Sequence, residues 1–358
     1  MGDLSSLVRY PVRRSEPLQA WDAADALLLK HAETLDLSGK NILILNDSFG
    51  ALSCGLEKHT PTTYTDSYVS KKAIELNSHG RIQAQSELSE LTGKFDYAFV
   101  RIPKNMSFFE DMLAHLSGHL NPGAQVICGS MLKHLAKASF ELLNRIIGET
   151  HTSLAEKKAR LIFAAFQRSD IKSPYPLQVP IEGFEKPFIN HSNLFSREKL
   201  DIGTRFLLEH IPTGSYPVIL DLGCGNGIVG IAAKQQHSGS KIIFSDESRM
   251  ATLSAADNYR NYFAAEAETK WIHSYENQEP CSLDLVLLNP PFHQGTSISD
   301  LVSWQMFKDG LAALKPGGLL RVIGNSSLHY PAVLQKLFGN STVVAKNPKF
   351  TIVDARKR

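Results

Sequence analysis

The chain has 358 residues, of which 43% are hydrophobic and 21% are charged, and its formal net charge is +2. This length accommodates two domains, and the composition is typical of a soluble globular protein rather than a disordered or fibrous one. No apolar run approaches the roughly 20 residues that a membrane span requires, so we expect no membrane partner, and the scattered cysteines fit a reducing, cytoplasmic location. The near-neutral charge excludes the large basic excess that many nucleic-acid binders carry.

The four cysteines are scattered, and none forms a C-x-x-C pair or stands at ligand spacing from a histidine. This excludes a disulfide framework and a zinc site of common spacing. The basic N-terminal stretch is not followed by an apolar segment, so no signal peptide is expected.

The first half alternates helical and strand patterns. Apolar residues at helical spacing follow Pro17, and proline suits the opening of a helix. Strands are then expected at 41–45, before Asp66, at 95–100 and at 124–128, the last entered through a turn at 121–123. Strands that alternate with helices predict a parallel α/β sheet.

The second half repeats these landmarks in the same order. Strands are expected at 218–220, 241–244, 284–288 and 319–323. Asp246 matches Asp66 and Pro316 matches Pro122, and the separation between matched residues grows slowly, as in a duplicated domain with small insertions. A generic α/β rhythm is the alternative. We predict two tandem duplicated Rossmann-like domains, residues 1–172 and 173–358, each a mostly parallel central sheet flanked by helices.

An apolar strand in the second half, Leu285–Leu288, ends at Asn289-Pro290-Pro291-Phe292. The strand stops there because proline removes a backbone donor and disfavours helical geometry in the residue before it. Open α/β sheets bind ligands at the carboxyl ends of their strands, which makes this segment a candidate catalytic site. Taken alone, an ordinary proline turn is an equally good interpretation.

A glycine-rich turn, Asp221–Gly227, follows the first strand of the second half. Its glycines let a ligand approach bare backbone, and the next helix points its N-terminal amides at that ligand. Asp246 stands about 20 residues on, as in the dinucleotide fingerprint, so a nicotinamide or flavin enzyme is one interpretation. However, Asp221 would repel a pyrophosphate and attract a cationic ligand, and a dehydrogenase has no evident use for Asn289–Phe292.

These three elements in this order resemble the class I S-adenosylmethionine-dependent methyltransferases that modify exocyclic amino nitrogens. The stretch Phe195–Thr204 and the duplicated layout are similar to the ribosomal RNA guanine-N2 methyltransferases of the RsmC and RlmG type. Pro17–Asp25 and Leu45–Leu52 look more like the RlmG branch, which acts on 23S rRNA of the large subunit. The resemblance spans nearly the whole chain.

The resemblance implies methyl transfer from S-adenosylmethionine to guanine N2 of 23S rRNA, with S-adenosylhomocysteine as product and no metal. The RNA is expected either naked or in a pre-assembled large subunit, and the enzyme as a monomer. Many of these enzymes carry an acid for adenine after the third strand, where residues 271–276 have no aspartate, so Ser274 is expected there instead. The implied catalytic residues are Asn289, Pro290 and Phe292, and the implied cofactor-binding residues are Asp221, Gly223, Gly225, Asn226, Gly227, Asp246 and Ser274.

The chemistry of an aromatic amine explains these catalytic residues. Its lone pair is delocalised into the ring, so acceptors at the Asn289 side-chain carbonyl and the Pro290 carbonyl would free it for attack, chiefly by positioning. Phe292 would stack on the extruded base, a contact worth about 1–3 kcal/mol. The motif alone would serve adenine N6 or cytosine N4 equally, so the base is assigned by the resemblance.

The first half keeps the scaffold without this chemistry. Residues 46–50 contain one glycine, and Phe49 would obstruct a cofactor. We predict a domain that binds no S-adenosylmethionine and holds RNA instead, and a retired duplicate that only stabilises its partner is the alternative. The candidate RNA-binding residues are Arg101, Lys104, Lys157, Lys158 and Arg160.

Three other functions stay open at the level of sequence. A guanine-N2 methyltransferase of small-subunit rRNA would share the glycine turn and the Asn-Pro-Pro segment. A protein glutamine methyltransferase would use the same Asn-Pro-Pro segment, because a side-chain amide presents a similar planar NH2 group. A non-catalytic RNA-binding assembly factor would have lost both sites, which the intact glycines and Asn289 argue against.

Overall fold

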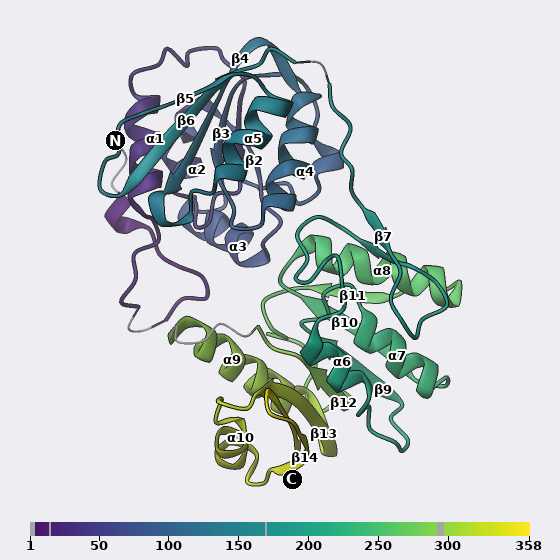
Figure 1. Ribbon diagram of the computed structural model, residues 1–358. Helices are drawn as coiled ribbons and strands as arrows, with labels where there is room; N and C mark the ends of the chain where they lie inside the picture. The colour runs from purple at the N-terminus through teal and green to yellow at the C-terminus, as the bar shows by residue number, and fades with distance from the viewer. Residues whose placement is uncertain (1–3, 14–15, 169, 292–296) are drawn as a thin grey trace. The chain divides into compact units, whose positions relative to one another are not determined.

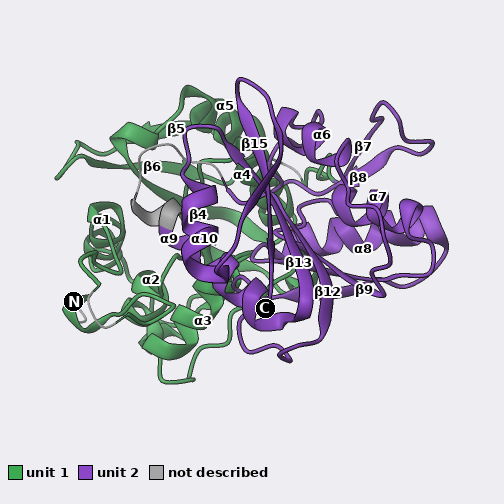
Figure 2. Cartoon of the chain, turned by 90° about the horizontal axis from the view of Figure 1, so that it is seen from below, with its two compact units in different colours: residues 1–175 green, residues 176–358 purple. Residues whose placement is uncertain are grey.

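The computed structural model describes residues 4–13, 16–168, 170–291 and 297–358. The chain divides into two compact units, Met1–Tyr175 (unit 1) and Pro176–Arg358 (unit 2), coloured separately in Figure 2. Each unit is built on one mostly parallel sheet with helices packed against it (Figure 1), so the predicted tandem Rossmann-like architecture is confirmed. None of the helices in the described ranges is long and apolar enough to cross a membrane.

Unit 1 has a six-stranded sheet in the order β2-β1-β3-β4-β6-β5. The first four strands in this order are parallel, and β6 runs antiparallel to both of its neighbours. The strands are β1 (Ile42–Leu45), β2 (Thr62–Tyr64), β3 (Phe95–Arg101), β4 (Leu120–Met131), β5 (Thr150–Thr152) and β6 (Ala159–Ala165). The α-helices are α1 (Ala23–Ala32), α2 (Ala51–Gly55), α3 (Tyr68–Asn77), α4 (Met106–Ser117) and α5 (Lys137–Ile146).

Unit 2 has a seven-stranded sheet in the order β11-β10-β9-β12-β13-β15-β14, preceded by a small antiparallel pair, β7 (Leu177–Val179) and β8 (Phe188–Asn190). The strands of the large sheet are β9 (Val218–Leu222), β10 (Lys241–Asp246), β11 (Glu268–Trp271), β12 (Leu283–Leu288), β13 (Leu314–Asn325), β14 (Thr342–Lys346) and β15 (Phe350–Arg356). The α-helices are α6 (Ile202–Leu208), α7 (Ile228–Gln236), α8 (Arg249–Phe263), α9 (Ser297–Ala313) and α10 (Tyr330–Phe338).

The two sheets share one topology. The order of unit 1 matches that of unit 2 except for the edge strand β11, whose place in unit 1 is taken by a single parallel bridge between Tyr64 and Gln85. The Pro-Gly segments at Pro122 and Pro316, which the sequence suggested as turns before strands, lie inside β4 and β13. Each coincides with a register shift against the neighbouring strand, since a bulge accommodates a residue that cannot donate to the ladder. The shared irregularity supports a duplication.

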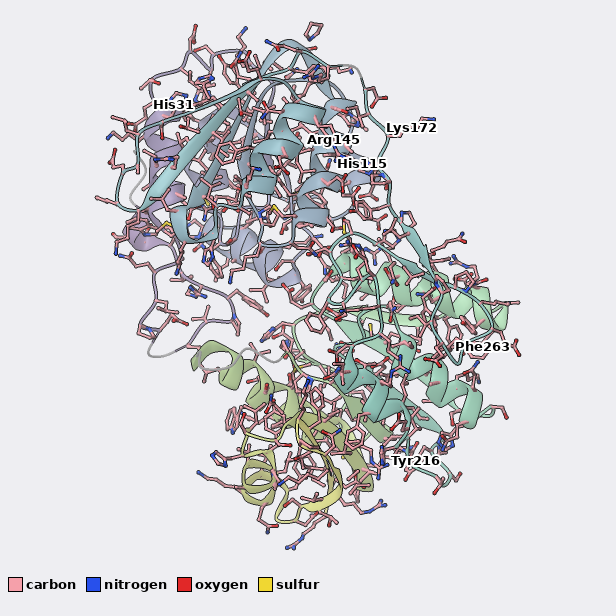
Figure 3. The ribbon with its side chains drawn as sticks, viewed as in Figure 1. His31, His115, Arg145, Lys172, Tyr216 and Phe263 are labelled. Atoms are coloured by element: carbon pink, nitrogen blue, oxygen red, sulfur yellow. The ribbon has the colours of Figure 1, made fainter. Side chains whose placement is uncertain are left out.

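The first long helix starts later than the sequence suggested. Asp22 caps α1 by accepting the Ala24 and Asp25 amide protons at 2.8 and 3.3 Å, and Asp25 accepts the Asp22 amide proton at 2.8 Å. This capping box sets the start of the helix at Ala23, six residues beyond Pro17. His31 then packs α1 onto β6, with its ring 4.8 Å from that of Phe163 (Figure 3).

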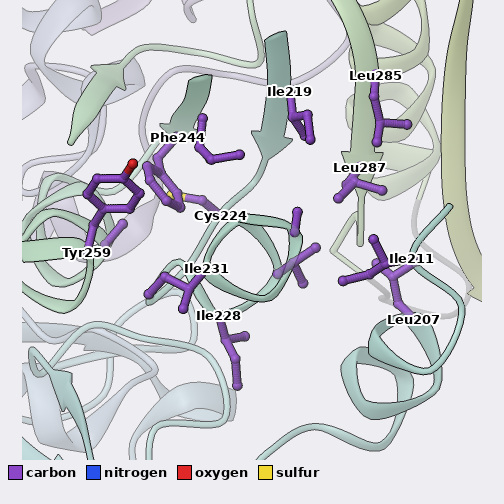
Figure 4. Close-up of a cluster of buried hydrophobic side chains, with 14 of the residues drawn as sticks. Leu207, Ile211, Ile219, Cys224, Ile228, Ile231, Phe244, Tyr259, Leu285 and Leu287 are labelled. Carbon is purple, nitrogen blue, oxygen red and sulfur yellow. The ribbon is translucent and has the colours of Figure 1, made fainter. Parts of the chain in front are cut away.

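The core of unit 2 holds the end of β9 close to α7. The cluster in Figure 4 joins buried side chains of β9, β10, β12 and α7, including Ile219, Phe244, Leu287 and Ile231. Gly230 permits this approach, because a Cβ at that position would lie 2.4 Å from the Phe244 ring. The turn between β9 and α7 is therefore anchored on both sides.

Candidate active site

The glycine turn and the Asn-Pro segment leave the sheet side by side. Strands β9 and β12 are parallel neighbours, with Leu222 opposite Leu288, so Gly223 and Asn289 follow at the same edge. A Cβ on Gly223 would lie 4.0 Å from the Asn289 carbonyl oxygen. The chain order of the strands reverses between β9 and β12, which is the point where open α/β sheets bind ligands.

The three glycines of the turn have different surroundings. All three have positive φ, at 72° for Gly223, 54° for Gly225 and 81° for Gly227. A Cβ on Gly227 would lie 3.0 Å from Ala255, so packing requires glycine there. A Cβ on Gly225 would meet no atom within 4 Å. The turn therefore presents bare backbone toward open space at Gly225.

Asp221 is buried and ties the strand to the helix. Its Oδ2 accepts the Gly230 amide proton at 2.8 Å. Burial raises the pKa of Asp221 to about 8, and the nearby Asp246 carboxylate adds to the rise, while the hydrogen bond from Gly230 opposes it. The sequence suggested Asp221 for its charge, and the geometry gives it a structural role as well.

Asp246 ends β10 beside the same turn. Its Oδ2 accepts the Gly225 amide proton at 2.9 Å, and its Oδ1 accepts that of Ser248 at 3.0 Å. Burial raises its pKa as well, and the backbone hydrogen bonds oppose the rise. Each carboxylate oxygen has further acceptor capacity, which suits the hydroxyl groups of a ribose. Neither Asp221 nor Asp246 is ion-paired with a lysine or arginine in the described part of the chain.

Asn226 lies in a network inside the protein. Its Nδ2 donates to Asn190 Oδ1 at 3.0 Å, and its Oδ1 accepts the Ile228 amide proton at 3.2 Å. Its carbonyl accepts from Asn258 Nδ2 at 3.0 Å. The side chain predicted to bind the cofactor thus holds the shape of the turn.

Two buried oxygen atoms near this edge have no hydrogen-bond partner among the described residues. One is Ser274 Oγ, on a residue with φ of 54° whose carbonyl accepts from Ser245 Oγ at 2.8 Å. The other is Asn289 Oδ1. Because buried polar atoms are nearly always paired, both are positions where a bound ligand would supply the missing partner.

The amide of Asn289 is held by a residue that the sequence did not single out. Asn289 Nδ2 donates to Thr204 Oγ1 on α6 at 2.8 Å. The sequence offered one indication of this role. Thr204 comes three residues after Asp201, which is the spacing between a helix N-cap and the backbone amide that it accepts from. Pro290 is buried after Asn289, and the predicted stacking residue Phe292 lies outside the described residues.

The corresponding turn of unit 1 is filled. Asp47 accepts from the amides of Gly50 and Ser53 at 3.1 and 2.8 Å, and from Ser53 Oγ at 2.8 Å. The Arg9 guanidinium lies 4.4 Å from the centre of the Phe49 ring. Asn77 donates to the Phe49 carbonyl at 2.7 Å and also bonds the backbone of the N-terminal arm.

Arg101, predicted to contact RNA, is held by carboxylates. It pairs with Asp22 at 2.8 Å and Asp25 at 3.0 Å, and its side chain is 13% exposed. Burial raises the pKa of Asp25 to about 7, and Arg101 opposes the rise. This placement favours a structural role for Arg101.

The other basic candidates gather at the carboxyl edge of the same sheet. Lys157 and Lys158 form the tip of a two-residue hairpin between Glu156 and Ala159, and both are exposed. Their φ values are 48° and 64°, which is the backbone of a type I′ turn. Ala159 and the half-buried Arg160 pair with the end of β4, and Lys104 is exposed just after β3.

Residues 2–168 match the RLMG N-terminal domain, and residues 185–354 match the methyltransferase small domain. The ribosomal RNA large subunit methyltransferase G of Pseudomonas syringae pv. syringae (strain B728a) is 41% identical, over 98% of this chain and 97% of that protein. The protein of the same name from Stutzerimonas stutzeri (strain A1501) is also 41% identical, over 98% of this chain and 96% of its own length.

The chain belongs to the ribosomal RNA large subunit methyltransferase G family. A solved structure, the T. thermophilus 16S rRNA N2 G1207 methyltransferase (RsmC) in complex with AdoMet and guanosine, superposes with a TM-score of 0.81. It covers 94% of this chain and 92% of its own at 21% identity, which shows a common two-domain fold.

The residues present fit the cofactor of a class I methyltransferase. Gly225 leaves backbone open, and Ser274 Oγ is buried without a partner in the described ranges. The two acids Asp221 and Asp246 favour the cationic S-adenosylmethionine over a pyrophosphate, because a nearby positive charge stabilises their ionised form and a nearby negative charge opposes it. Across the described ranges, no three histidine, cysteine, aspartate or glutamate side chains cluster as metal ligands.

Proposed function

We propose that this protein transfers a methyl group from S-adenosylmethionine to the exocyclic N2 amino group of one guanine in 23S ribosomal RNA. The observation that carries the proposal is the buried, unpartnered Asn289 Oδ1 in the described structure, beside the glycine turn at the switch point of the sheet. An acceptor held there without a donor is suited to an NH2 group. Family membership supports ribosomal RNA of the large subunit as the substrate.

The residues of the chain act by holding the amine. Asn289 Oδ1 and the Pro290 carbonyl each accept one proton of the guanine amine, which localises the nitrogen lone pair and aims it. S-adenosylmethionine, when bound, supplies an electrophilic methyl group on a positively charged sulfur. Asp246 and Ser274 hold its ribose and adenine, and Gly225 allows its approach. Neither acceptor is a strong base, so the amine proton leaves to solvent after transfer.

Unit 1 binds no cofactor in this proposal. Phe49 packs against Arg9 in the turn of unit 1 that corresponds to the glycine turn, and Asp47 uses its oxygens within that turn. Calorimetric titration with S-adenosylmethionine should therefore give one site per chain. A stoichiometry of two would overturn this assignment.

The carboxyl edge of unit 1 binds RNA phosphates instead. Burial lowers the pKa of His134, and the charges of Lys104 and Lys133 lower it further, so both lysines lie near this histidine. The Lys158 carbonyl accepts the Leu132 amide proton at 2.8 Å, so the Lys157-Lys158 tip lies against the same segment. Several lysines on one edge form the electrostatic footprint of a phosphate backbone.

The decisive test uses ribosomal RNA from cells that lack the gene. The purified protein, working as a cytoplasmic monomer, is incubated with labelled S-adenosylmethionine and either naked 23S rRNA, assembled large subunits, 16S rRNA or a release factor. We expect N2-methylguanine at one position of 23S rRNA, located by mass mapping. Methylation of 16S rRNA or of a glutamine, or of nothing, would refute the proposal.

A further inference from the structure

Thr204 lies between the side-chain amide of Asn289 and the carboxylate of Asp201. Its Oγ1 accepts from Asn289 Nδ2 at 2.8 Å and lies 3.4 Å from Asp201 Oδ2. Asp201 is the N-cap of α6 and accepts the Thr204 amide proton at 2.9 Å. Thr204 is 8% exposed, so water competes little for its hydroxyl group.

The neighbouring Gly203 makes room for this arrangement. A Cβ on Gly203 would lie 3.0 Å from Asp201 Oδ2 and 3.1 Å from the Phe350 ring. Any side chain there would push Asp201 away from the first turn of α6. The carboxylate is therefore fixed against Thr204 by the cap and by the missing side chain together.

The direction of the hydrogen bonds follows from the number of protons available. An ionised carboxylate only accepts, and a hydroxyl has a single proton to donate. Once the Thr204 proton points at Asp201, Thr204 offers only lone pairs to Asn289. The NH2 of Asn289 must then face Thr204, and its carbonyl oxygen must face the opposite side.

We propose that Thr204, backed by Asp201, is a positioning residue that fixes the orientation of the Asn289 amide. The inference rests on the proposed role of Asn289 as acceptor for the substrate amine. In the reverse orientation, the Asn289 carbonyl would face the lone pairs of Thr204, and its NH2 would face the NH2 of guanine. The Asp201–Thr204 pair thus selects a substrate group that donates hydrogen bonds and rejects a carbonyl or ring nitrogen at the same place.

The test compares Thr204→Val, which keeps the shape and removes the acceptor, with Thr204→Ser, which keeps the hydroxyl group. We expect Thr204→Val to lower kcat by about 10- to 100-fold through misplacement of the amide. The Kd of S-adenosylmethionine, which also reports that the fold is intact, and the KM for RNA should stay unchanged. Thr204→Ser should restore most of the kcat. In the double variant Asn289→Ala/Thr204→Val, kcat should be no lower than in Asn289→Ala alone, because the two substitutions remove the same interaction.

The outcomes separate this inference from the function on which it rests. Wild-type kcat in Thr204→Val, with Asn289→Ala inactive, would overturn the orienting role alone. Full activity of Asn289→Ala would remove Asn289 from the mechanism and both proposals with it. If Thr204→Val loses cofactor binding, Thr204→Ala takes its place, and wild-type kcat in that variant overturns the orienting role equally.

Discussion

The turn between the first strand of the large sheet and the following helix differs between the two units. In unit 2 the backbone between β9 and α7 is bare at Gly225, and two buried carboxylates stand beside it. In unit 1 the corresponding turn is closed by Phe49 beneath Arg9. The sheet order around both turns is the same apart from one edge strand. The scaffold therefore keeps a glycine at the helix start in both units, as Gly227 and Gly50, and does not need the glycines at 223 and 225, where unit 1 has Asn46 and Ser48.

The same contrast holds at the end of β12 and of its counterpart in unit 1, β3. In the register of the two sheets, Asn289 of unit 2 corresponds to Arg101 of unit 1, and Pro291 corresponds to Pro103. The second proline is therefore present in both units, whereas the amide is present in unit 2 and replaced by an arginine in unit 1. At this edge of its sheet, unit 1 has exposed lysines. Unit 2 has buried oxygen atoms there that lack hydrogen-bond partners among the described residues.

The largest expected effect comes from removing the side chain of Asn289. Asn289→Ala removes the acceptor for the amine and should lower kcat by about 10³-fold, with the Kd of S-adenosylmethionine unchanged. Single-turnover methylation of 23S rRNA measures the first quantity and calorimetry the second. Ile102→Ala, in the segment of unit 1 that corresponds to the Asn-Pro-Pro segment, is the control and should leave kcat unaltered. Equal losses in both variants would erase the proposed difference between the units.

The next effect tests the bare backbone. Gly225→Ala adds a methyl group that meets no protein atom, so the chain should lose only about 1–2 kcal/mol for the left-handed backbone. Affinity for S-adenosylmethionine should fall about 100-fold, because the methyl group occupies the ligand's space. Gly50→Ala, with φ of 89° and a Cβ 3.3 Å from Ile74, should cost stability and leave that affinity intact. Unaltered binding in Gly225→Ala would contradict the placement of the cofactor.

A smaller effect concerns the hairpin tip of unit 1. Asn-Gly is the preferred pair for a type I′ turn, so Lys157→Asn with Lys158→Gly should raise the free energy of unfolding by about 0.5–1 kcal/mol. The same change should weaken RNA binding and reduce the slope of log K against log salt by about 1 per lysine. A variant both more stable and weaker in binding would show that the strained lysines are kept for RNA.

The matched control for that variant removes two lysines from the opposite edge of the same sheet. Lys40 precedes β1 and Lys94 precedes β3, and both are exposed. Lys40→Gln with Lys94→Gln makes an equal change in net charge, so an equal loss of RNA affinity would mean that only overall charge matters.

The smallest effect is a pH dependence shared by both turns. Because the folded pKa of Asp221 is raised to about 8, its contribution to stability is complete below the ordinary pKa of an aspartate and is lost as pH rises through about 8. Asp221→Asn stays neutral, so without cofactor its Tm should exceed that of the wild type by about 3 °C above pH 8 and approach it near pH 4. Burial raises the pKa of Asp47 too, so Asp47→Asn should show the same sign. Saturating S-adenosylmethionine should reverse the order only for Asp221→Asn.

Much of the fold could be predicted because the strands of both units are short apolar runs with polar ends. The glycine turn and Asn289 were found for the same reason, since each follows such a run directly in the chain. Long-range partners carry no such signal. Arg101 looked free until folding placed it between Asp22 and Asp25, and Asn226 looked available until it met Asn190 and Asn258.

The role of Thr204 could not be predicted from the sequence for the same reason. It stands 85 residues before the amide that it holds, and only the cap at Asp201 hinted at its surroundings. The start of α1 was missed because the capping box at Asp22 outweighs the preference of Pro17 for a first turn.

The tether between an acid and the third residue of the following helix exists in both units, from Asp221 to Gly230 and from Asp47 to Ser53. The acid comes from a different point of the chain in each unit, since Asp221 lies inside β9 and Asp47 follows the end of β1. The hydrogen bond to the helix is thus a way of joining the first strand to the next helix in this fold. Its presence in a duplicated domain does not by itself mark a cofactor site.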